Sequence, residues 1–337
     1  MRFFQYISIF AFICIAGFFI YQYSPHYQII KGEIFGTYYT IKIKTDVKDK
    51  QLKEKIEARL HEINASQSVF IDDSEVSNIN QAKAGKKIKL SPDMRNVLRV
   101  TDKVYHQTGG AFDPSLGKLI DLWGFGASSL SLPDDKVIKK VLRSTGFAKF
   151  KFTSDYQYIS KSQSDLFLNL SGIAKGYSVD EITTLLEKEG YRNFIVEIGG
   201  EIKTKGYRND VKEAWVVGIN RPSASSNENI MAVSLSNMAV ATSGNYRNFY
   251  ETDGKKYGHT ISPTTGYPVE TDVLSASVFD DSCMKADAYA TSIVVMGVEK
   301  GLEFANKYKL KVIIYDNEYR RHLSLAAKDM FREENGQ

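Results

Sequence analysis

Cysteine is scarce in this sequence, whose 337 residues contain only Cys14 and Cys283. Cys14 lies in an apolar amino-terminal stretch, which leaves Cys283 without a cysteine partner in the body of the chain. A disulfide framework and a zinc site built on clustered cysteines and histidines are therefore excluded. We expect Cys283 to be a small, buried apolar side chain.

A surplus of charge of one sign is also missing. The chain has 44 basic and 40 acidic residues, a formal net charge of +4, and no long basic run. A chain with this charge balance is not expected to form the positive surface that binds nucleic-acid phosphates, so we expect no nucleic-acid partner. Internal repeats, low-complexity runs, Walker loops and dinucleotide fingerprints are absent too. With 43% hydrophobic residues, the chain is instead able to bury a full core.

Long apolar runs are confined to the amino end, where residues 7–21 are almost wholly apolar. This length lies between the apolar region of a cleaved signal, about 7 to 15 residues, and the roughly 20 residues of a spanning helix. Because no small-residue cleavage site follows, the pattern favours an uncleaved signal anchor over residues 1–23. The alternative is a lipoprotein modified at Cys14. In both cases we expect the body of the protein at the inner membrane, on its periplasmic, extracytoplasmic side.

The remaining chain is expected to form a connector over residues 24–31 and one large domain over residues 32–330. Residues 37–44 alternate apolar and polar side chains as a half-buried strand does, and residues 52–63 show helical spacing. Further helices are predicted over 91–106 with Ser91 as the N-cap, 134–143, 179–188, 285–296 and 299–308, and further strands over 194–198, 201–205, 215–219, 230–235 and 312–315. This irregular mixture predicts an α+β fold with mixed or antiparallel sheets and packed helices.

Two glycine-containing segments suit the binding of a phosphorylated heterocycle. In residues 108–114, paired glycines let the backbone approach a ligand, and Asp113 beside Phe112 offers a carboxylate next to a stacking surface. In residues 169–180, a turn opens a helix whose amide groups and positive dipole end, together with Lys175, suit an anion such as pyrophosphate. An ordinary turn and an ordinary helix cap are the structural alternatives.

Two further segments carry a candidate base and a candidate metal site. His259 lies in residues 257–268, which are rich in hydroxyls and glycines, and an imidazole there can accept the proton of a hydroxyl nucleophile. Asp287 and Thr291 are four residues apart and share one face of a predicted helix. An oxygen pair of this kind suits Mg²⁺ and not zinc. A core histidine and a helix-surface pair are the alternatives.

Taken in order, these segments resemble the FAD:protein FMN transferase family, often called ApbE. The resemblance is carried by Gly-Ala-Phe-Asp, Ser-Gly-Ile-Ala-Lys-Gly-Tyr, Thr-Ser-Gly-Asn-Tyr-Arg, His-Thr-Ile-Ser-Pro-Thr-Thr-Gly and Ala-Asp-Ala-Tyr-Ala-Thr, and it extends from residue 35 to beyond residue 291. It implies the ApbE-like, T-fold-like α+β domain. The residues it implies for FAD are Phe35, Phe70, Ala111, Phe112, Asp113, Asn169, Lys175 and Thr260.

For the metal, the resemblance implies ligation of Mg²⁺ by Asp287, Thr291 and the backbone carbonyl of Gly172. The chain departs from the family pattern at two positions. Asn169 stands where the family often has aspartate, which puts one hydrogen bond to the adenine portion in doubt. Ala290 stands where some members have a further aspartate, which weakens the expected metal site but leaves its central pair intact.

The function implied by the resemblance is Mg²⁺-dependent transfer of FMN from FAD. The acceptor is a Ser or Thr hydroxyl of an exported or membrane redox flavoprotein, the product is a phosphoester, and AMP is released. His259 would accept the proton of the hydroxyl, and Lys175 would stabilise the phosphates. Two alternatives stay open: an FAD pyrophosphatase, in which water replaces the hydroxyl, and a non-catalytic FAD-binding lipoprotein. The presence of Asp287 and Thr291 favours an enzyme.

Overall fold

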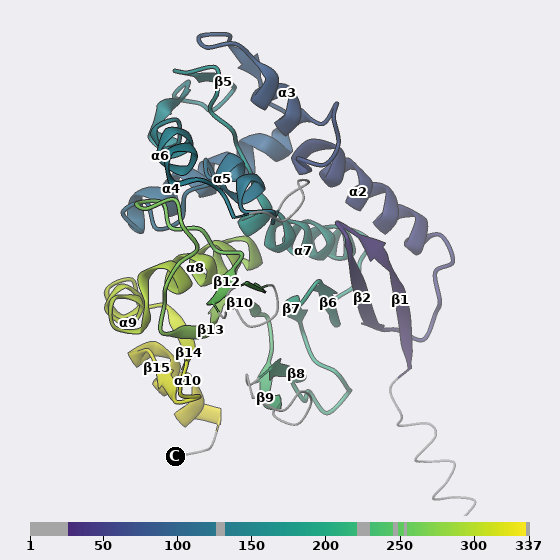
Figure 1. Ribbon diagram of the computed structural model, residues 1–337. Coiled ribbons are helices and arrows are strands. Elements are labelled where there is room, and N and C mark those ends of the chain that lie inside the picture. Colours follow the sequence, from purple (N-terminus) through teal and green to yellow (C-terminus); the bar gives the residue numbers. More distant parts are fainter. Residues whose placement is uncertain (1–25, 126–131, 221–229, 245–248, 253–254, 335–337) are drawn as a thin grey trace, which may run out of the picture.

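The computed structural model describes residues 26–125, 132–220, 230–244, 249–252 and 255–334. In these residues, eight strands pair antiparallel into one sheet, whose order is β1-β2-β6-β7-β10-β13-β14-β15 (Figure 1). The strands are β1 (Tyr27–Ile34), β2 (Thr37–Lys44), β6 (Phe194–Ile198), β7 (Glu201–Lys205), β10 (Ala239–Gly244), β13 (Val273–Asp280), β14 (Lys311–Asp316) and β15 (Arg321–Leu323). The predicted α+β class with antiparallel pairing is confirmed.

The first hairpin of the sheet corrects one predicted boundary. The strand predicted over residues 37–44 is confirmed as β2, with Ile41 and Ile43 fully buried. Residues 27–31 were predicted as connector, yet they form the first part of β1 and pair with β2 from Tyr27 to Ile34. The prediction was wrong there because β1 alternates weakly and contains a glycine. The ordered body therefore begins before residue 32.

Four helices cover one face of the sheet. Their bounds are α2 (Leu52–Gln67), α7 (Ser171–Lys188), α8 (Cys283–Met296) and α9 (Val298–Lys307). The helix predicted over 179–188 begins eight residues earlier, because Gly172 and Gly176 lie inside α7 and not in a turn before it. A Cβ on Gly176 would lie 2.4 Å from the carbonyl oxygen of Cys283, so this glycine allows α7 and α8 to pack closely. Cys283 itself is a buried thiol, as predicted.

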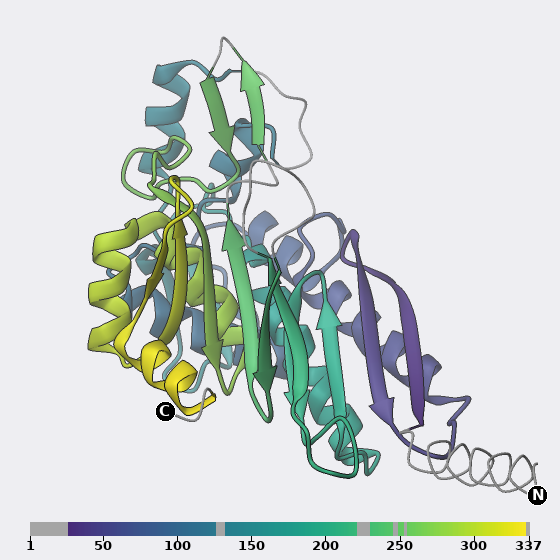
Figure 2. The ribbon, with the colours of Figure 1, turned by 90° about the horizontal axis from the view of Figure 1, so that it is seen from below.

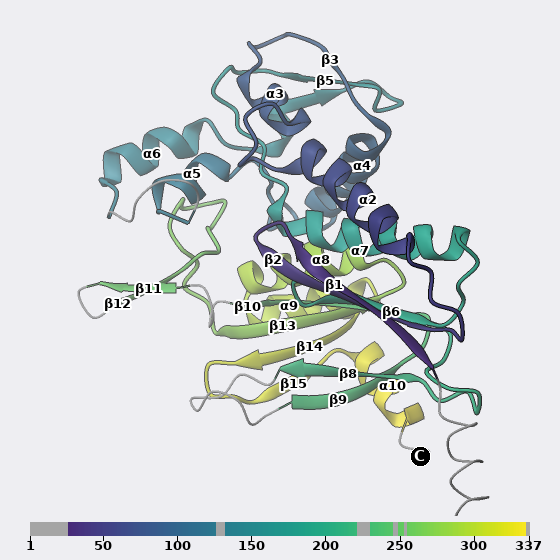
Figure 3. The ribbon, with the colours of Figure 1, turned by 90° about the vertical axis from the view of Figure 1, so that its right-hand side faces the viewer.

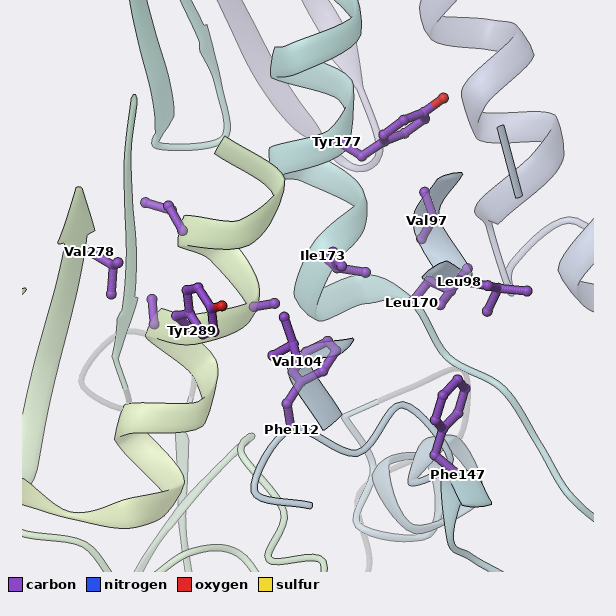
Figure 4. Close-up of a cluster of buried hydrophobic side chains, with 14 of the residues drawn as sticks. Val97, Leu98, Val104, Phe112, Phe147, Leu170, Ile173, Tyr177, Val278 and Tyr289 are labelled. Carbon is purple, nitrogen blue, oxygen red and sulfur yellow. The ribbon is translucent and has the colours of Figure 1, made fainter. Parts of the chain in front are cut away.

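A second layer of short elements packs on these helices. It contains α3 (Glu75–Gln81), α4 (Pro92–Gln107), α5 (Gly117–Leu122), α6 (Asp135–Arg143), the short 3-10 helix η1 (Phe147–Lys149), and a small sheet of β3 (Ile88–Lys89), β4 (Phe150–Phe152) and β5 (Tyr158–Lys161). The predicted cap of α4 is confirmed, since Ser91 Oγ accepts a hydrogen bond from the Met94 amide at 3.1 Å. Figure 4 shows Ile173 of α7, Tyr289 of α8 and Phe112 in the apolar cluster between the layers.

The opposite face of the sheet is covered by the hairpin of β8 (Trp215–Asn220) and β9 (Ile230–Leu235), together with α10 (Leu325–Glu334). Figures 2 and 3 show a separate hairpin, β11 (Phe249–Thr252) with β12 (Lys255–Gly258), at one end of the strands of the sheet. In the part of the chain that the structure describes, no helix has the length and apolar character needed to cross a membrane. The predicted anchor, residues 1–23, lies outside that part.

Candidate functional site

A cavity of about 1030 Å³ opens where the first turn of α7 meets α8, the loop before α5, the β6–β7 turn and the loop after β12. This volume is at the upper end of the range for small-molecule sites, as a dinucleotide requires. It collects predicted site residues that lie far apart in the sequence. These are Phe70, Ala111, Phe112, Asp113, Asn169, Gly172, Lys175, His259, Thr260, Asp287 and Thr291.

Phe35 is the one predicted site residue that is missing from the described lining of the cavity. It lies in the β1–β2 turn with a positive φ of 54°, and its side chain packs against both large apolar clusters. Phe35 therefore packs into the body of the protein at this turn, and its contact with FAD stays a prediction. Phe70, in contrast, lines the cavity with 67% of its surface exposed, so its ring is available to stack on a flat group.

The amino end of α7 is built to receive an anion. Asn169 Oδ1 accepts a hydrogen bond from the Ser171 amide at 2.9 Å, and the Asn169 amide donates to the Pro114 carbonyl at 2.7 Å. These contacts fix the first turn of the helix against the Asp113 loop. The amides and dipole of this 18-residue helix favour negative charge at its amino end, which faces the cavity.

Asp113 and Phe112 form the wall beside this turn. Asp113 accepts a hydrogen bond from the Ser115 amide at 2.8 Å. Burial raises the pKa of the Asp113 carboxyl, although hydrogen bonds from Ser115 and the Phe147 backbone oppose that rise. Phe112 is 4% exposed and lies against Gly172, where an added Cβ would be 3.2 Å from its ring. A flat ligand bound here would meet a carboxylate beside an aromatic edge.

The three residues predicted to hold a metal come together across the α7–α8 contact. Asp287 is 2% exposed, and its Oδ2 accepts a hydrogen bond from the Gly176 amide at 3.0 Å. Thr291 Oγ1 lies 3.1 Å from Ser243 Oγ and 3.5 Å from the position that a Cβ on Gly172 would take. The predicted common face of Asp287 and Thr291 is therefore directed at the first turn of α7.

These groups suit Mg²⁺. The donors are a carboxylate, a hydroxyl and a backbone carbonyl, which are the hard oxygen ligands that Mg²⁺ takes, with substrate phosphate and water completing its shell. Within the described residues, no group of three or more His, Cys, Asp and Glu side chains could hold a metal. Asp287, Thr291 and the Gly172 carbonyl would fill only part of an octahedral shell, and water, or a diphosphate at the α7 amino end, would complete it.

Lys175 and Glu201 add an ion pair with a buried carboxylate to this end of the cavity. Lys175 Nζ lies 3.3 Å from Glu201 Oε1, with the two side chains 30% and 4% exposed. Burial disfavours the ammonium, but Asp287 and Glu201 outweigh it and raise the pKa of Lys175. Burial also raises the pKa of Glu201, with Lys175 opposing and Asp287 adding to the rise. The ammonium thus stays charged next to the predicted diphosphate position.

His259 lines the same cavity from the segment directly after β12. Its ring contacts the ring of Phe125 edge-on at a centroid distance of 6.3 Å, and both residues line the cavity. The carbonyl of Thr260, its neighbour, accepts a hydrogen bond from the Val269 amide at 2.8 Å, which holds this loop against the body. Asn245 to Asn248, part of the motif that precedes His259, lie outside the described residues.

A model of the ApbE family matches residues 35–314. The chain belongs to the ApbE family. The resemblance that the sequence motifs predicted is confirmed, and the match covers all the cavity-lining segments described above.

Relatives and solved structures of the ApbE family match over nearly the whole chain. The FAD:protein FMN transferase of Vibrio cholerae is 34% identical over 314 residues, 90% of this chain and 93% of the relative. That of Escherichia coli K12 is 31% identical over 86% of this chain and 84% of its own. The structure of the flavin transferase ApbE from Vibrio cholerae superposes with a TM-score of 0.85 at 32% identity, covering 91% of this chain and 99% of that one. The ApbE protein of Thermotoga maritima gives a TM-score of 0.81 at 26% identity, covering 90% and 99%.

Sequence reasoning missed some residues of this ApbE site. Glu201 and Ser243 line the cavity and contact predicted site residues, and neither was predicted to contribute. Glu201 lies at the start of a predicted strand, where a glutamate is ordinarily solvent-exposed, and its burial arises only when α7 and α8 pack over β7. Ser243 belongs to the Thr-Ser-Gly motif, so the motif itself was the available signal.

Proposed function

We propose that the protein transfers the FMN half of FAD to a Ser or Thr hydroxyl of another protein. The observation that carries this proposal is the convergence of Asp287, Thr291 and Gly172 at the anion-binding end of α7, beside Lys175 and within one cavity that also contains His259. Membership of the ApbE family and the FAD:protein FMN transferase relatives support it.

The proposed reaction assigns different cavity residues to FAD and to the acceptor hydroxyl. Bound FAD places its diphosphate against the amino end of α7, where the helix amides and Lys175 stabilise the charge of the phosphates. Phe70 offers aromatic surface for its rings, Phe112 offers an aromatic edge, and Asp113 offers a carboxylate for hydrogen bonds. Mg²⁺, held by Asp287, Thr291 and the Gly172 carbonyl, would neutralise charge that develops on the diphosphate as its bond breaks.

Bond changes in this reaction balance without a further reactant. The acceptor hydroxyl oxygen forms a bond to the phosphorus of the FMN half, and the P–O–P bond to the AMP half breaks, so that AMP leaves with the bridging oxygen. A ring nitrogen of His259 accepts the hydroxyl proton. The product is a phosphoester between FMN and the acceptor side chain.

The proposed cellular setting follows from the amino-terminal sequence. Residues 7–21 are apolar enough to export the chain and to hold it at the membrane, so we place the enzyme on the extracytoplasmic side of the inner membrane. Its acceptor would then be an exported or membrane redox flavoprotein. Lipid attachment at Cys14 would give the same location.

A product assay tests this function. The full chain is incubated with FAD and Mg²⁺, with and without an exported redox flavoprotein produced free of flavin, and AMP and protein-bound FMN are both quantified by mass. The proposal predicts equal amounts of AMP and protein-bound FMN, formed only with acceptor. AMP and free FMN formed regardless of acceptor would make the protein an FAD pyrophosphatase. Bound but intact FAD would make it a storage protein.

A further inference from the structure

Glu201 is a buried carboxylate that the proposed reaction does not use. It lies at the first position of β7, directly after the Gly199–Gly200 turn, and is 3% exposed. Its Oε1 is 3.3 Å from Lys175 Nζ, whereas its Oε2 has no hydrogen-bond partner among the described residues. A buried carboxylate oxygen without a donor is costly, so its retention at a cavity wall calls for an explanation.

The charges around this atom balance only while Glu201 keeps its proton. The Lys175 ammonium interacts electrostatically with both Glu201 and Asp287, yet burial and Asp287 raise the pKa of Glu201 to about 8, so near neutral pH this carboxyl ionises only if further positive charge is close to it. Unpaired charge inside a protein is strongly unfavourable unless a counter-ion compensates it. One additional positive charge would suit the cluster, and Asp287 already lies at the proposed Mg²⁺ site.

The same two elements contain an ordinary ion pair for comparison. Glu187 of α7 lies 2.7 Å from Lys205 of β7 at the far end of the helix, with the two side chains 37% and 30% exposed. Both partners of that pair have solvent access, which screens their interaction. The two lysines are equally exposed, at 30%, so the Lys175–Glu201 pair differs in the burial of its glutamate, 4% against 37% exposed, and in the neighbouring Asp287.

We propose that Glu201 is a positioning residue of the metal site: with Asp287 it attracts either the Lys175 ammonium or a divalent cation, so that Lys175 and the metal compete for the same carboxylates. While the metal is absent, Lys175 and the proton on Glu201 neutralise the two carboxylates. When the metal binds, it displaces that proton to solvent and leaves the ammonium to the diphosphate. This inference rests on the proposed Mg²⁺ site.

Two substitutions that change the charge of the cluster in opposite directions distinguish a role in positioning the metal from a purely structural role. Glu201→Gln removes a negative charge from the cluster, and because Oε2 accepts no hydrogen bond in the described structure, the amide breaks none. Lys175→Gln removes the competing cation. Glu187→Gln is the matched control, since it removes the same charge from the solvent-exposed α7–β7 pair.

The experiment titrates Mn²⁺, without any nucleotide, into the flavin-free full chain in detergent and follows free Mn²⁺ by electron paramagnetic resonance. Glu201→Gln is expected to weaken Mn²⁺ binding about tenfold or more, Lys175→Gln to strengthen it by a similar factor, and Glu187→Gln to leave it unchanged within about twofold. A thermal melt of each variant shows that it is folded.

Three results would overturn the inference. If both cluster variants weaken Mn²⁺ binding, Glu201 and Lys175 act by holding the structure together. If Glu201→Gln binds Mn²⁺ as the unaltered chain does, Glu201 takes no part in the metal site. If the unaltered chain binds no Mn²⁺ at all, both this inference and the proposed metal site are wrong. The first two results would contradict this inference alone and would leave the proposed metal site in place.

Discussion

The backbone amide of Gly176 donates a hydrogen bond of 3.0 Å to Asp287 Oδ2, and this contact links the first turns of α7 to α8. A side chain at residue 176 is sterically excluded, because its Cβ would lie 2.4 Å from the Cys283 carbonyl oxygen and 2.8 Å from Asp287 Cβ. One glycine thus sets both the helix spacing and the direction of the carboxylate that we assign to the metal.

Gly176→Ala is expected to lower the free energy of unfolding by about 2–3 kcal/mol, because the neighbouring contact is backbone and cannot move aside easily. Gly172→Ala, one turn earlier, would meet side chains at 3.2 Å or more and should cost less. Urea unfolding of both variants measures the difference. Equal losses of stability in the two variants would mean that the close approach of α7 and α8 at residue 176 does not determine how these helices pack.

Asp287→Asn should reduce the rate of FMN transfer by at least about 100-fold while leaving FAD binding within a few-fold. An asparagine oxygen can still accept the hydrogen bond from the Gly176 amide, so the fold is retained and only the charge that attracts the metal is lost. Transfer kinetics and FAD fluorescence titration together measure the effect. Normal transfer by this variant would remove Asp287 from the metal site.

His259→Ala is expected to lower the transfer rate by about 10²- to 10⁴-fold, the usual contribution of a general base. FAD affinity should change little, because the proposed role of His259 is toward the acceptor hydroxyl. His106→Ala is the control, since that imidazole is 68% exposed on α4 and is not among the residues that line the described cavity. A His259→Ala enzyme with an unchanged rate would show that another group accepts the proton.

The Asp316 carboxylate, at the end of β14, accepts hydrogen bonds from Glu318, Arg320 and His322 across the turn to β15. Burial alone would raise the pKa of Asp316, but hydrogen bonds from His322 and Arg320, at 2.8 Å each, and from the backbone outweigh burial and hold that pKa well below its usual value. Because the pKa of Asp316 is lower in the folded state, its ionised carboxylate stabilises the fold at pH values above the unfolded-state pKa, near 4. This stabilisation is lost as the pH falls through the folded-state pKa.

Asp316→Asn should therefore lower the free energy of unfolding by about 1–3 kcal/mol at pH 7, and the difference from the unaltered protein should narrow as the pH falls below about 4. Urea unfolding of both proteins, at pH 7 and at a pH below about 4, measures this difference in the free energy of unfolding. Asp281→Asn, at an exposed position, is the control and should change little. A difference that stays constant with pH would contradict the assigned role of the carboxylate.

Elements with a local signal could be predicted from the sequence. The alternation of β2, the Ser91 cap of α4 and the helical spacing of α2 are all set by neighbours within a few residues, and the structure confirms each. In contrast, β10 and β13 were not predicted. They are covered on both faces and contain small residues, so they show no regular alternation.

The candidate site was predictable to the extent that its residues form motifs. Asp287 and Thr291 share a helix face, and this was visible from their spacing. Their meeting with Gly172 required the packing of α7 on α8, which the spacing does not contain. The burial of Glu201 likewise depends on elements that are distant in the sequence, so a single strand pattern gave no indication of it.

The most direct test of the central claim is the intact mass of an acceptor flavoprotein, produced without flavin, after incubation with the full chain and FAD in Mg²⁺, in EDTA, and in EDTA followed by excess Mg²⁺. A metal-assisted transferase adds FMN to the acceptor in the first and third conditions and not in the second. Acceptor that gains FMN equally in EDTA, or that gains none in any condition while AMP accumulates, would contradict this account.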